Sequence, residues 1–173
     1  GNANAGTGRI LTLGGGNISV TAASGDVNTG SSTAGFNYLR DAPYFTPFAV
    51  NPFTGQIAKT STLGGISTAA GGNVTISAGG DVISYLPIGD PSQPTSAPGG
   101  DPGTGAFGLE PGDVTVRAGG SIFGHYVVVN GTGTLQAGEN IATASKNTAL
   151  SLVQGHWSLD ALSGDIYLQE VRN

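Results

Sequence analysis

The sequence predicts an all-β fold, a right-handed parallel β-helix (a solenoid) with coils of about 19 residues and two loop insertions. Three observations lead to this prediction. One short motif recurs five times among the 173 residues, apolar and polar residues alternate within each copy, and glycine contributes 31 residues while charged residues make up only 10%. Alternation is typical of a strand with one buried face, and a repeated motif is typical of stacked, near-identical units.

The five copies share the pattern polar-Φ-x-Φ-x-Ala, where Φ is an apolar residue, followed by a glycine-rich turn and another apolar residue. They lie at 17–27, 73–82, 113–122, 132–141 and 156–166. Since side chains alternate between the two faces of a strand, the apolar residues of each copy share one face and the polar residues share the other. We therefore expect an interior built from Ile18, Val20, Ala22, Val74, Ile76, Ala78, Val114, Val116, Ala118, Gly133, Leu135, Ala137, Trp157, Leu159 and Ala161.

The turn that follows each motif strand predicts a corner of the coil. Glycine adopts positive φ at no steric cost, so we expect left-handed backbone at 79–80 and 119–120. Asp26, Asp81 and Asp165 occupy this corner in their copies. Stacked carboxylates can serve glycoside hydrolysis or hold calcium, but Asp is also favoured in turns for its backbone hydrogen bonds, and we prefer the turn interpretation.

The spacing of the copies predicts how the chain is organised. The alanines that align, at positions 22, 78, 118, 137 and 161, are separated by 56, 40, 19 and 24 residues. The shortest separation defines the bare coil, and the two longest predict insertions at 31–66 and 86–111 in one β-helical segment over 1–173. A β-sandwich also has short strands, but its strands do not repeat one sequence in one register, so we favour the β-helix.

The two insertions differ in composition. The second, 86–111, is rich in Pro and Gly, whereas 36–53 within the first holds half of the 12 aromatic residues and three prolines. Because proline removes backbone donors, we expect an ordered, non-strand excursion there. Aromatic rings can stack on sugars or anchor a protein partner, and a long loop also needs apolar residues to pack as a flap, so both interpretations stay open. The candidate ligand-binding residues are Tyr38, Arg40, Tyr44, Phe45, Phe48 and Phe53.

Little in the sequence points to catalysis. The chain has no Cys, and its two histidines, His125 and His156, lie near no other ligand at metal-site spacing, so we expect them exposed at coil corners. Arg117 should point outward at mid-strand, where a β-helical polysaccharide lyase would keep a basic residue. A net charge of −5 without a Lys/Arg cluster predicts no nucleic-acid binding. We expect no enzyme activity, no catalytic residue, no cofactor and no metal.

The repeat Gly-Gly-Asn-Val-Thr-Ile-Ser-Ala-Gly-Gly-Asp-Val at 71–82 is echoed at 15–27 and 112–122. It resembles the filamentous-haemagglutinin-like β-helix of two-partner secretion exoproteins. That resemblance implies a shaft segment of a large protein that crosses the outer membrane of a Gram-negative bacterium through a secretion pore and folds outside. It implies an extracellular or cell-surface location.

The repeat and the resemblance together predict a structural and adhesive shaft segment that displays loops to surfaces, glycans or host and partner proteins. Its neighbours would be adjoining coils of the same parent chain or of other subunits. The sequence contains no Met, so we expect a processed or excised piece. A polysaccharide-active β-helix enzyme is one alternative. The other is a self-assembling extracellular filament, in which open coil ends pair by strand addition.

Overall fold

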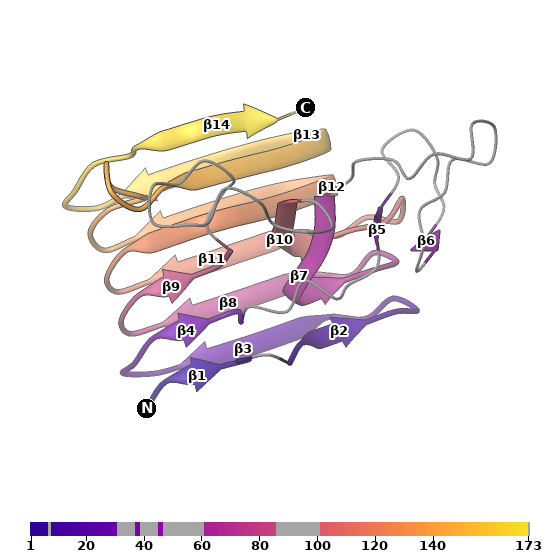
Figure 1. Cartoon of the computed structure of the whole chain (residues 1–173), viewed down its shortest axis with the longest axis horizontal. Helices are drawn as coiled ribbons and strands as arrows, with labels where there is room; N and C mark the ends of the chain where they lie inside the picture. The colour runs from indigo at the N-terminus through magenta and orange to yellow at the C-terminus, as the bar shows by residue number, and fades with distance from the viewer. Residues whose placement is uncertain (7, 31–36, 39–44, 47–60, 86–100, 173) are drawn as a thin grey trace.

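The fold is all-β and almost entirely parallel. A computed structural model describes residues 1–6, 8–30, 37–38, 45–46, 61–85 and 101–172 (Figure 1). These residues contain 14 strands in one connected sheet and no helix. The only antiparallel pairings among them join β5 (Asn37–Tyr38) to β6 (Phe45–Thr46) and to β7, and residue Thr143 to Lys146. The all-β prediction is confirmed, and the parallel strands are compatible with a β-helix.

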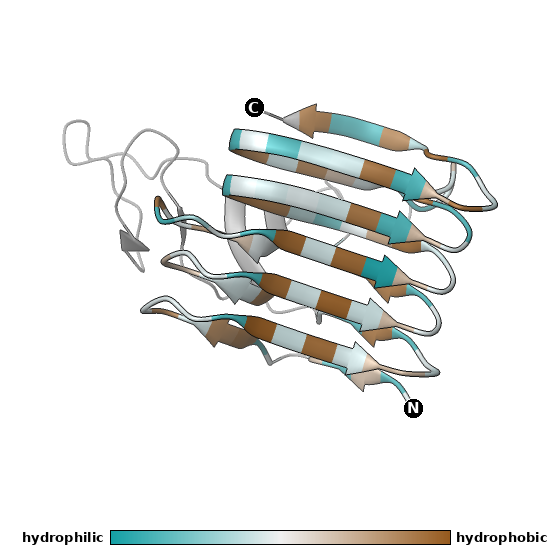
Figure 2. Cartoon of the chain, turned by 180° about the vertical axis from the view of Figure 1, so that it is seen from behind, coloured by the Kyte–Doolittle hydropathy of each residue, from teal (hydrophilic) through white to brown (hydrophobic). Residues whose placement is uncertain are grey.

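The strands form three stacked columns, and we call one passage of the chain through all three a tier. The first column contains the motif strands, in the order β3 (Ile18–Ala22), β8 (Val74–Ala78), β11 (Val114–Ala118) and the C-terminal parts of β12 (Ile122–Ala137) and β13 (Thr148–Ala161). The five motif alanines pair directly from strand to strand, so the alignment of the copies is confirmed. Figure 2 shows the alternation of apolar and polar residues along these strands.

The other two columns complete each tier. The second column contains β1 (Ala3–Asn4), β4 (Val27–Asn28), β9 (Val82–Ile83), the start of β12, and single bridges at Ile141 and Ile166. The third contains β2 (Ile10–Thr12), β7 (Ser61–Thr68), β10 (Asp101–Ala106), the middle of β12, the start of β13, and β14 (Leu168–Arg172). The chain runs through the second, third and first columns in turn.

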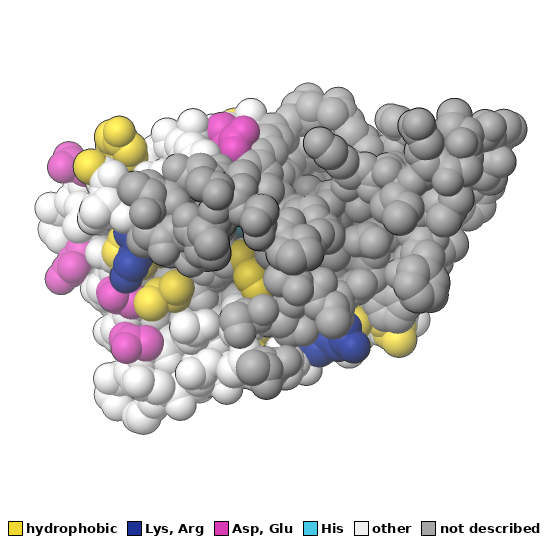
Figure 3. All heavy atoms as spheres, viewed as in Figure 1, with side chains coloured by type: hydrophobic (Ala, Val, Ile, Leu, Met, Phe, Trp, Pro, Cys, Tyr) yellow, Lys and Arg dark blue, Asp and Glu magenta, His cyan; other side chains and the backbone are white. Residues whose placement is uncertain are grey.

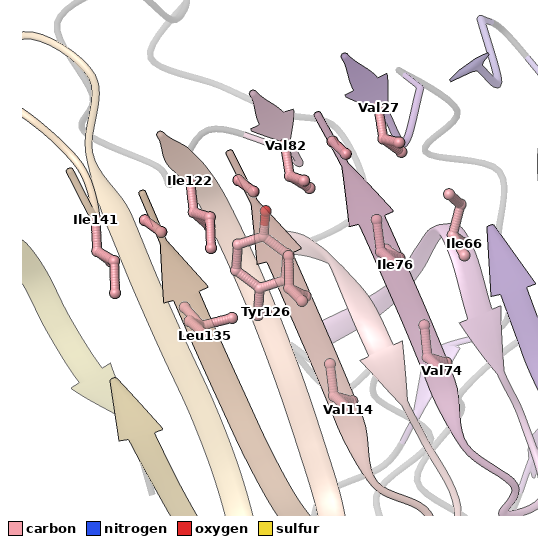
Figure 4. Close-up of a cluster of buried hydrophobic side chains, with 14 of the residues drawn as sticks. Val27, Ile66, Val74, Ile76, Val82, Val114, Ile122, Tyr126, Leu135 and Ile141 are labelled. Atoms are coloured by element: carbon pink, nitrogen blue, oxygen red, sulfur yellow. The ribbon is translucent and has the colours of Figure 1, made fainter. Parts of the chain in front are cut away.

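All three columns face one apolar interior (Figure 4). Val74, Ile76 and Leu135 enter it from the first column, Val82 from the second and Tyr126 from the third, and each is fully buried. The predicted interior is therefore confirmed in the middle tiers. At the two ends of the stack Val20, Trp157, Leu159 and Ala161 are only half-buried, because no further tier covers them.

The third column departs from the rule that polar residues face outward. Its inward residues, such as Tyr126 and Val128, alternate with Val127 and Val129, which form a second buried apolar cluster with Phe107 and Ala69. In the middle tiers both faces of this column are thus shielded from water. Strands buried on both faces lose the strict alternation that identified the motif strands, which is why this column is hard to recognise in the sequence.

The predicted positive φ at corners 79–80 and 119–120 is wrong, since positive φ is found at none of these glycines. Their small size is needed for another reason. A Cβ built at Gly79 would overlap the carbonyl of Ala23 one tier away, and one at Gly119 would overlap the carbonyl of Gly79. Tier-to-tier contact excludes a side chain there. Positive φ occurs instead before the motif strand, as at Gly72, where φ is 93°.

Parts of the ranges predicted as insertions belong to the columns. β7 begins within the range 31–66 and ends just beyond it, and β10 lies within 86–111. The two strands pair with each other in parallel, from Asp101 with Ser61 to Ala106 with Thr68. Their sequences, STLGGIST and DPGTGA, contain glycine and proline and little alternation, so they do not stand out as strands.

The burial pattern generates a test. Ile76→Ala removes a fully buried side chain from the centre of the first column, and we expect it to lower the free energy of unfolding by about 2–5 kcal/mol. Thr75→Ala, on the outward face of the same strand, is the matched control and should change it by less than about 0.5 kcal/mol. Urea unfolding followed by circular dichroism measures both. Equal losses would contradict the assignment of the two faces.

Candidate functional site

A continuous ladder of side-chain oxygens runs along the corner between the first and second columns. At each tier a side-chain oxygen accepts the backbone N–H of the equivalent residue in the next tier. The acceptor-to-donor steps are Asn2 to Asp26 at 3.0 Å, Asp26 to Asp81 at 2.9 Å, Asp81 to Ser121 at 2.7 Å, Ser121 to Asn140 at 3.2 Å and Asn140 to Asp165 at 3.0 Å. This corner ladder joins the five complete tiers and the start of a sixth, which consists of Ile166 and β14. Acidic side chains gather along the same edge in Figure 3.

Glycine precedes most ladder residues because the acceptor of the tier before occupies the space that a side chain would need. A Cβ at Gly80 would overlap Asp26 Oδ1, and a Cβ at Gly120 would overlap Asp81 Oδ1. Gly25 and Gly164 are constrained in the same way by Asn2 and Asn140. The recurring Gly-Asp corner is therefore one structural unit, in which the glycine of each tier makes room for the carboxylate or amide of its neighbour.

One tier breaks the glycine pattern and supports this explanation. Glu139 stands before Asn140, where the other tiers have glycine. The acceptor facing it is Ser121, whose hydroxyl is shorter than an Asp or Asn side chain and leaves space for a Cβ. The Ser121 hydroxyl also donates to a Glu139 carboxylate oxygen at 3.4 Å. A long acceptor is paired with glycine, and a short acceptor with a larger residue.

A second, shorter ladder runs along the opposite end of the motif strands. Asn17 accepts the N–H of Asn73 at 2.8 Å, Asn73 accepts that of Asp113 at 2.9 Å, and Asp113 accepts that of Thr132 at 2.8 Å. At both ends of the motif strands, side-chain oxygens of one tier thus accept backbone N–H groups of the next tier along the chain. In the first three motif copies, the polar residue that opens the copy thus binds the backbone of the next tier.

Asp26 and Asp81 act through these backbone hydrogen bonds, although not within their own turn as the sequence suggested. Ser121 and Asn140, which interrupt the series of carboxylates in the sequence, continue the ladder because any side-chain oxygen of suitable reach can accept. Among the described residues, no three His, Asp or Glu side chains gather where they could hold a metal ion. The recurrence of Gly-Asp, Gly-Asn and Gly-Ser dipeptides one coil apart was the signal that could have revealed this role.

A buried polar group lies on the outer side of the third column. His125 is fully buried, so its predicted exposure is wrong, whereas the exposure of His156 is confirmed. His125 Nε2 and Ser151 Oγ are 2.7 Å apart in a hydrogen bond. Nearby, the Ser84 hydroxyl contacts the Thr104 hydroxyl and the His125 carbonyl, both at 2.9 Å. His125 was misjudged because both faces of this column are covered.

Tyr85 and Tyr126 are buried, neutral residues of the fold. Burial raises the pKa of Tyr85 to about 12, although a hydrogen bond with the Gly65 backbone and the charge of Arg9 act in the opposite direction. Burial alone raises the pKa of Tyr126 far above its ordinary range, and the Tyr126 hydroxyl donates to the Phe123 carbonyl at 3.0 Å. Neither phenol is ionised near neutral pH.

Arg117 points outward from the middle of β11, as predicted, and is exposed. Its in-register neighbours are Ser77 on one side and Gln136 on the other, so a carboxylate occupies neither position. The nearest acidic position in this row is Asp160, one strand further, where it accepts a hydrogen bond from Gln136 at 3.3 Å. The row places polar side chains on the surface of the first column.

The six candidate ligand-binding residues are only partly described. The backbones of Tyr38 and Phe45 are cross-strand partners in the β5–β6 hairpin, and β5 is joined to β7 through Asn37 and Thr62. The hairpin thus shows strand structure where the sequence predicted none, and it starts beside the third column. The other four, Arg40, Tyr44, Phe48 and Phe53, lie outside the described residues.

No family model, curated protein or solved structure matches the chain. The resemblance to two-partner secretion exoproteins therefore stays a prediction from the motif. In the described ranges we also find no helix of the length and apolarity that crossing a membrane requires.

The pairing of a glycine with a long acceptor predicts that substitutions at Gly120 and Asp81 have coupled effects on the free energy of unfolding. Gly120→Ala should lower the free energy of unfolding by about 1–3 kcal/mol, because the new Cβ overlaps the Asp81 carboxylate. In an Asp81→Ser background the shorter acceptor relieves the overlap, and the added cost of Gly120→Ala should fall by about 0.5–3 kcal/mol in a double-mutant cycle.

Gly119→Ala is the matched control for that cycle. Its Cβ would overlap the backbone of Gly79, which Asp81→Ser leaves in place, so its cost should be the same in both backgrounds. A Gly120→Ala cost that is equally independent of the background would contradict the paired arrangement of glycine and acceptor.

The buried His125–Ser151 hydrogen bond generates a second prediction for this region. Ser151→Ala should lower the free energy of unfolding by about 1–3 kcal/mol, because the hydroxyl contacts an imidazole that is wholly excluded from water. The exposed Ser158→Ala should change it by less than about 0.5 kcal/mol. Thermal and urea unfolding of both variants measure the difference, and indistinguishable values would show that the pair is not stabilising.

Proposed function

We propose that the chain is a segment of a right-handed parallel β-helix and serves as the structural and adhesive shaft of a fibrous, secreted or cell-surface protein. The observation that carries the proposal is the repetition of one register and one corner hydrogen bond through every tier. Each tier rests only on its neighbours, so the same unit extends without a change of design. The right hand follows from the general rule for crossovers between parallel strands.

The placement of the insertions supports a display role. The first insertion lies between Gly30 and β7 and contains β5 and β6, and the second lies between Tyr85 and β10. The strands before them, β4 and β9, are paired, and so are the strands after them. Both insertions therefore leave and re-enter the stack at the same corner of adjacent tiers.

A third tier also has additional residues at this corner. In the fifth tier, 142–147 separates the second column from the third, Ala142 has a positive φ of 67°, and the Lys146 ammonium lies 4.7 Å from the centre of the Phe123 ring. Segments that add length at one corner project from one edge and leave the other two corners free to stack. Such an edge is suited to contact a glycan or a protein on another surface, with the aromatic span 36–53 as the candidate contact.

This division between scaffold and display can be tested by replacing residues 31–60 with a short Gly/Ser linker. We expect β-sheet circular dichroism and the urea unfolding midpoint to be retained, because the columns are built from other residues, and binding on a glycan array to be lost. Tyr38→Ala and Phe45→Ala in the intact chain should each weaken binding by about tenfold or more.

The matched control is replacement of 86–100 by the same linker, which removes the neighbouring insertion and leaves the aromatic residues in place. It should retain binding. If the chain bound no glycan or surface protein in any form, or bound equally well without 31–60, the adhesive part of the proposal would be contradicted. Loss of β-structure in the linker variant would contradict the scaffold part.

A further inference from the structure

The outward face of the first column carries one hydroxyl group in every complete tier. The position between the first two inward residues of each motif strand holds Ser or Thr, and these positions pair directly from strand to strand. We call this set the hydroxyl row: Ser19, Thr75, Thr115, Thr134 and Ser158. Neighbouring strands lie about 4.8 Å apart, so the row is evenly spaced along the stack. Its threonines belong to inner tiers, which have a paired strand on each side.

The fold itself makes no use of these hydroxyls. Ser19 and Ser158 are exposed, the three threonines are partly exposed, and none of the five hydroxyls is hydrogen-bonded to another described residue. By contrast, the buried hydroxyls of Thr104 and Thr148 are both hydrogen-bonded within the fold. Thr is favoured in strands for its branched side chain, but the two serines lack that branch and share only the hydroxyl. Packing and internal hydrogen bonding therefore do not explain the recurrence.

Among the described residues, nothing covers the hydroxyl row. Figure 2 shows the molecule from the side of the first column, and no described part of the chain crosses the motif strands. The insertions leave the stack at the corner between the second and third columns, which the first column does not share. The two ends of the motif strands are instead held by the ladders of side-chain acceptors. The row is therefore a continuous surface feature of the described stack.

The charges beside the hydroxyl row favour an uncharged partner. The neighbouring outward row consists of Thr21, Ser77, Arg117, Gln136 and Asp160, with one basic and one acidic residue. Such a face attracts neither a polyanion nor a polycation, and the net charge of −5 disfavours a polyanion further. Neither row contains an apolar side chain, so the face lacks the aromatic or aliphatic anchors on which most protein interfaces depend. It offers repeated, uncharged hydrogen-bonding groups.

We propose that the hydroxyl row binds a neutral, linear polysaccharide that lies extended along the stack. Sugar hydroxyls, like those of Ser and Thr, both donate and accept hydrogen bonds, so the two sets can pair without any charged group. Each tier supplies one weak contact, and contacts with successive sugars of one chain reinforce each other because they are linked. The inference rests on the proposed shaft function, and it gives the stacked tiers a binding role separate from that proposed for the insertions.

The test is electrophoresis of the intact 173-residue chain through native gels that contain a soluble polysaccharide. Hydroxyethylcellulose, a neutral glucan with an extended backbone, should retard the chain in proportion to its concentration. Dextran, a neutral glucan with a flexible backbone, is the matched control and should not retard it. Cellohexaose, a short form of the same extended backbone, should compete only at a sugar concentration about 100-fold higher, because it spans few tiers.

Two triple variants test the hydroxyls themselves. Combined Thr75→Val, Thr115→Val and Thr134→Val keeps the branched side chains and removes the three inner hydroxyls. It should weaken binding to hydroxyethylcellulose about tenfold or more, since three hydrogen-bonding groups are lost. Substitution of the same three residues by Ser keeps the hydroxyls and should bind as the native chain does. Circular dichroism of both variants checks that the β-structure is retained, as their outward positions lead us to expect.

Three outcomes would overturn the inference: no retardation by hydroxyethylcellulose, equal retardation by dextran, or unchanged retardation of the valine variant. The chain in which a linker replaces 31–60 separates the inference from the adhesive role of the insertions. It should keep its retardation, although it loses binding to the short glycans of an array, which span too few tiers. If it is no longer retarded, the binding belongs to the insertion and the hydroxyl row has no such role. Failure of the row with intact β-structure leaves the proposed shaft function standing.

Discussion

The structure depends on close contact between successive tiers at the corner after each motif strand. A side-chain oxygen of one tier must reach the backbone N–H of the next, at 2.7–3.2 Å, and the long side chains of Asp and Asn can do so only if no side chain projects from the residue before that N–H. Glycine meets that condition where the acceptor is Asp or Asn. The recurrence of the motif follows from this constraint, because a substitution at one corner creates an overlap or removes a hydrogen bond in the neighbouring tier.

This constraint also assigns the aspartates. Carboxylates repeated along an edge invite an interpretation as a catalytic or calcium-binding row, yet the Oδ1 atoms of Asp26 and Asp81 are used by backbone donors of the next tier. The third column, with its buried outer cluster around Phe107 and the His125–Ser151 pair, and the corner from which the insertions leave are the places where the tiers differ from one another.

The corners between the columns differ in how many additional residues they accommodate, which explains where extra residues occur. The corner between the first and second columns accepts only one additional residue, as in the Ala-Ser-Gly-Asp and Leu-Ser-Gly-Asp corners, because the ladder must stay in register. Among the described residues, the corner between the second and third columns carries no such ladder, and tiers differ there by tens of residues. The added residues therefore leave the stack at one corner and do not interrupt the pairing of the columns.

The sequence by itself determined the all-β class, the five motif strands, their register and the buried residues of the middle tiers, because period-two alternation and repetition are properties of neighbouring residues. It did not reveal β7 and β10, whose glycines and prolines hide the pattern, nor the burial of His125, which depends on cover over a second face. It suggested positive φ where glycine is needed for contact between tiers. Residues far apart in the chain, such as Asp26 and Gly80, become neighbours only when tiers stack, and only the tertiary structure could decide what each makes possible for the other.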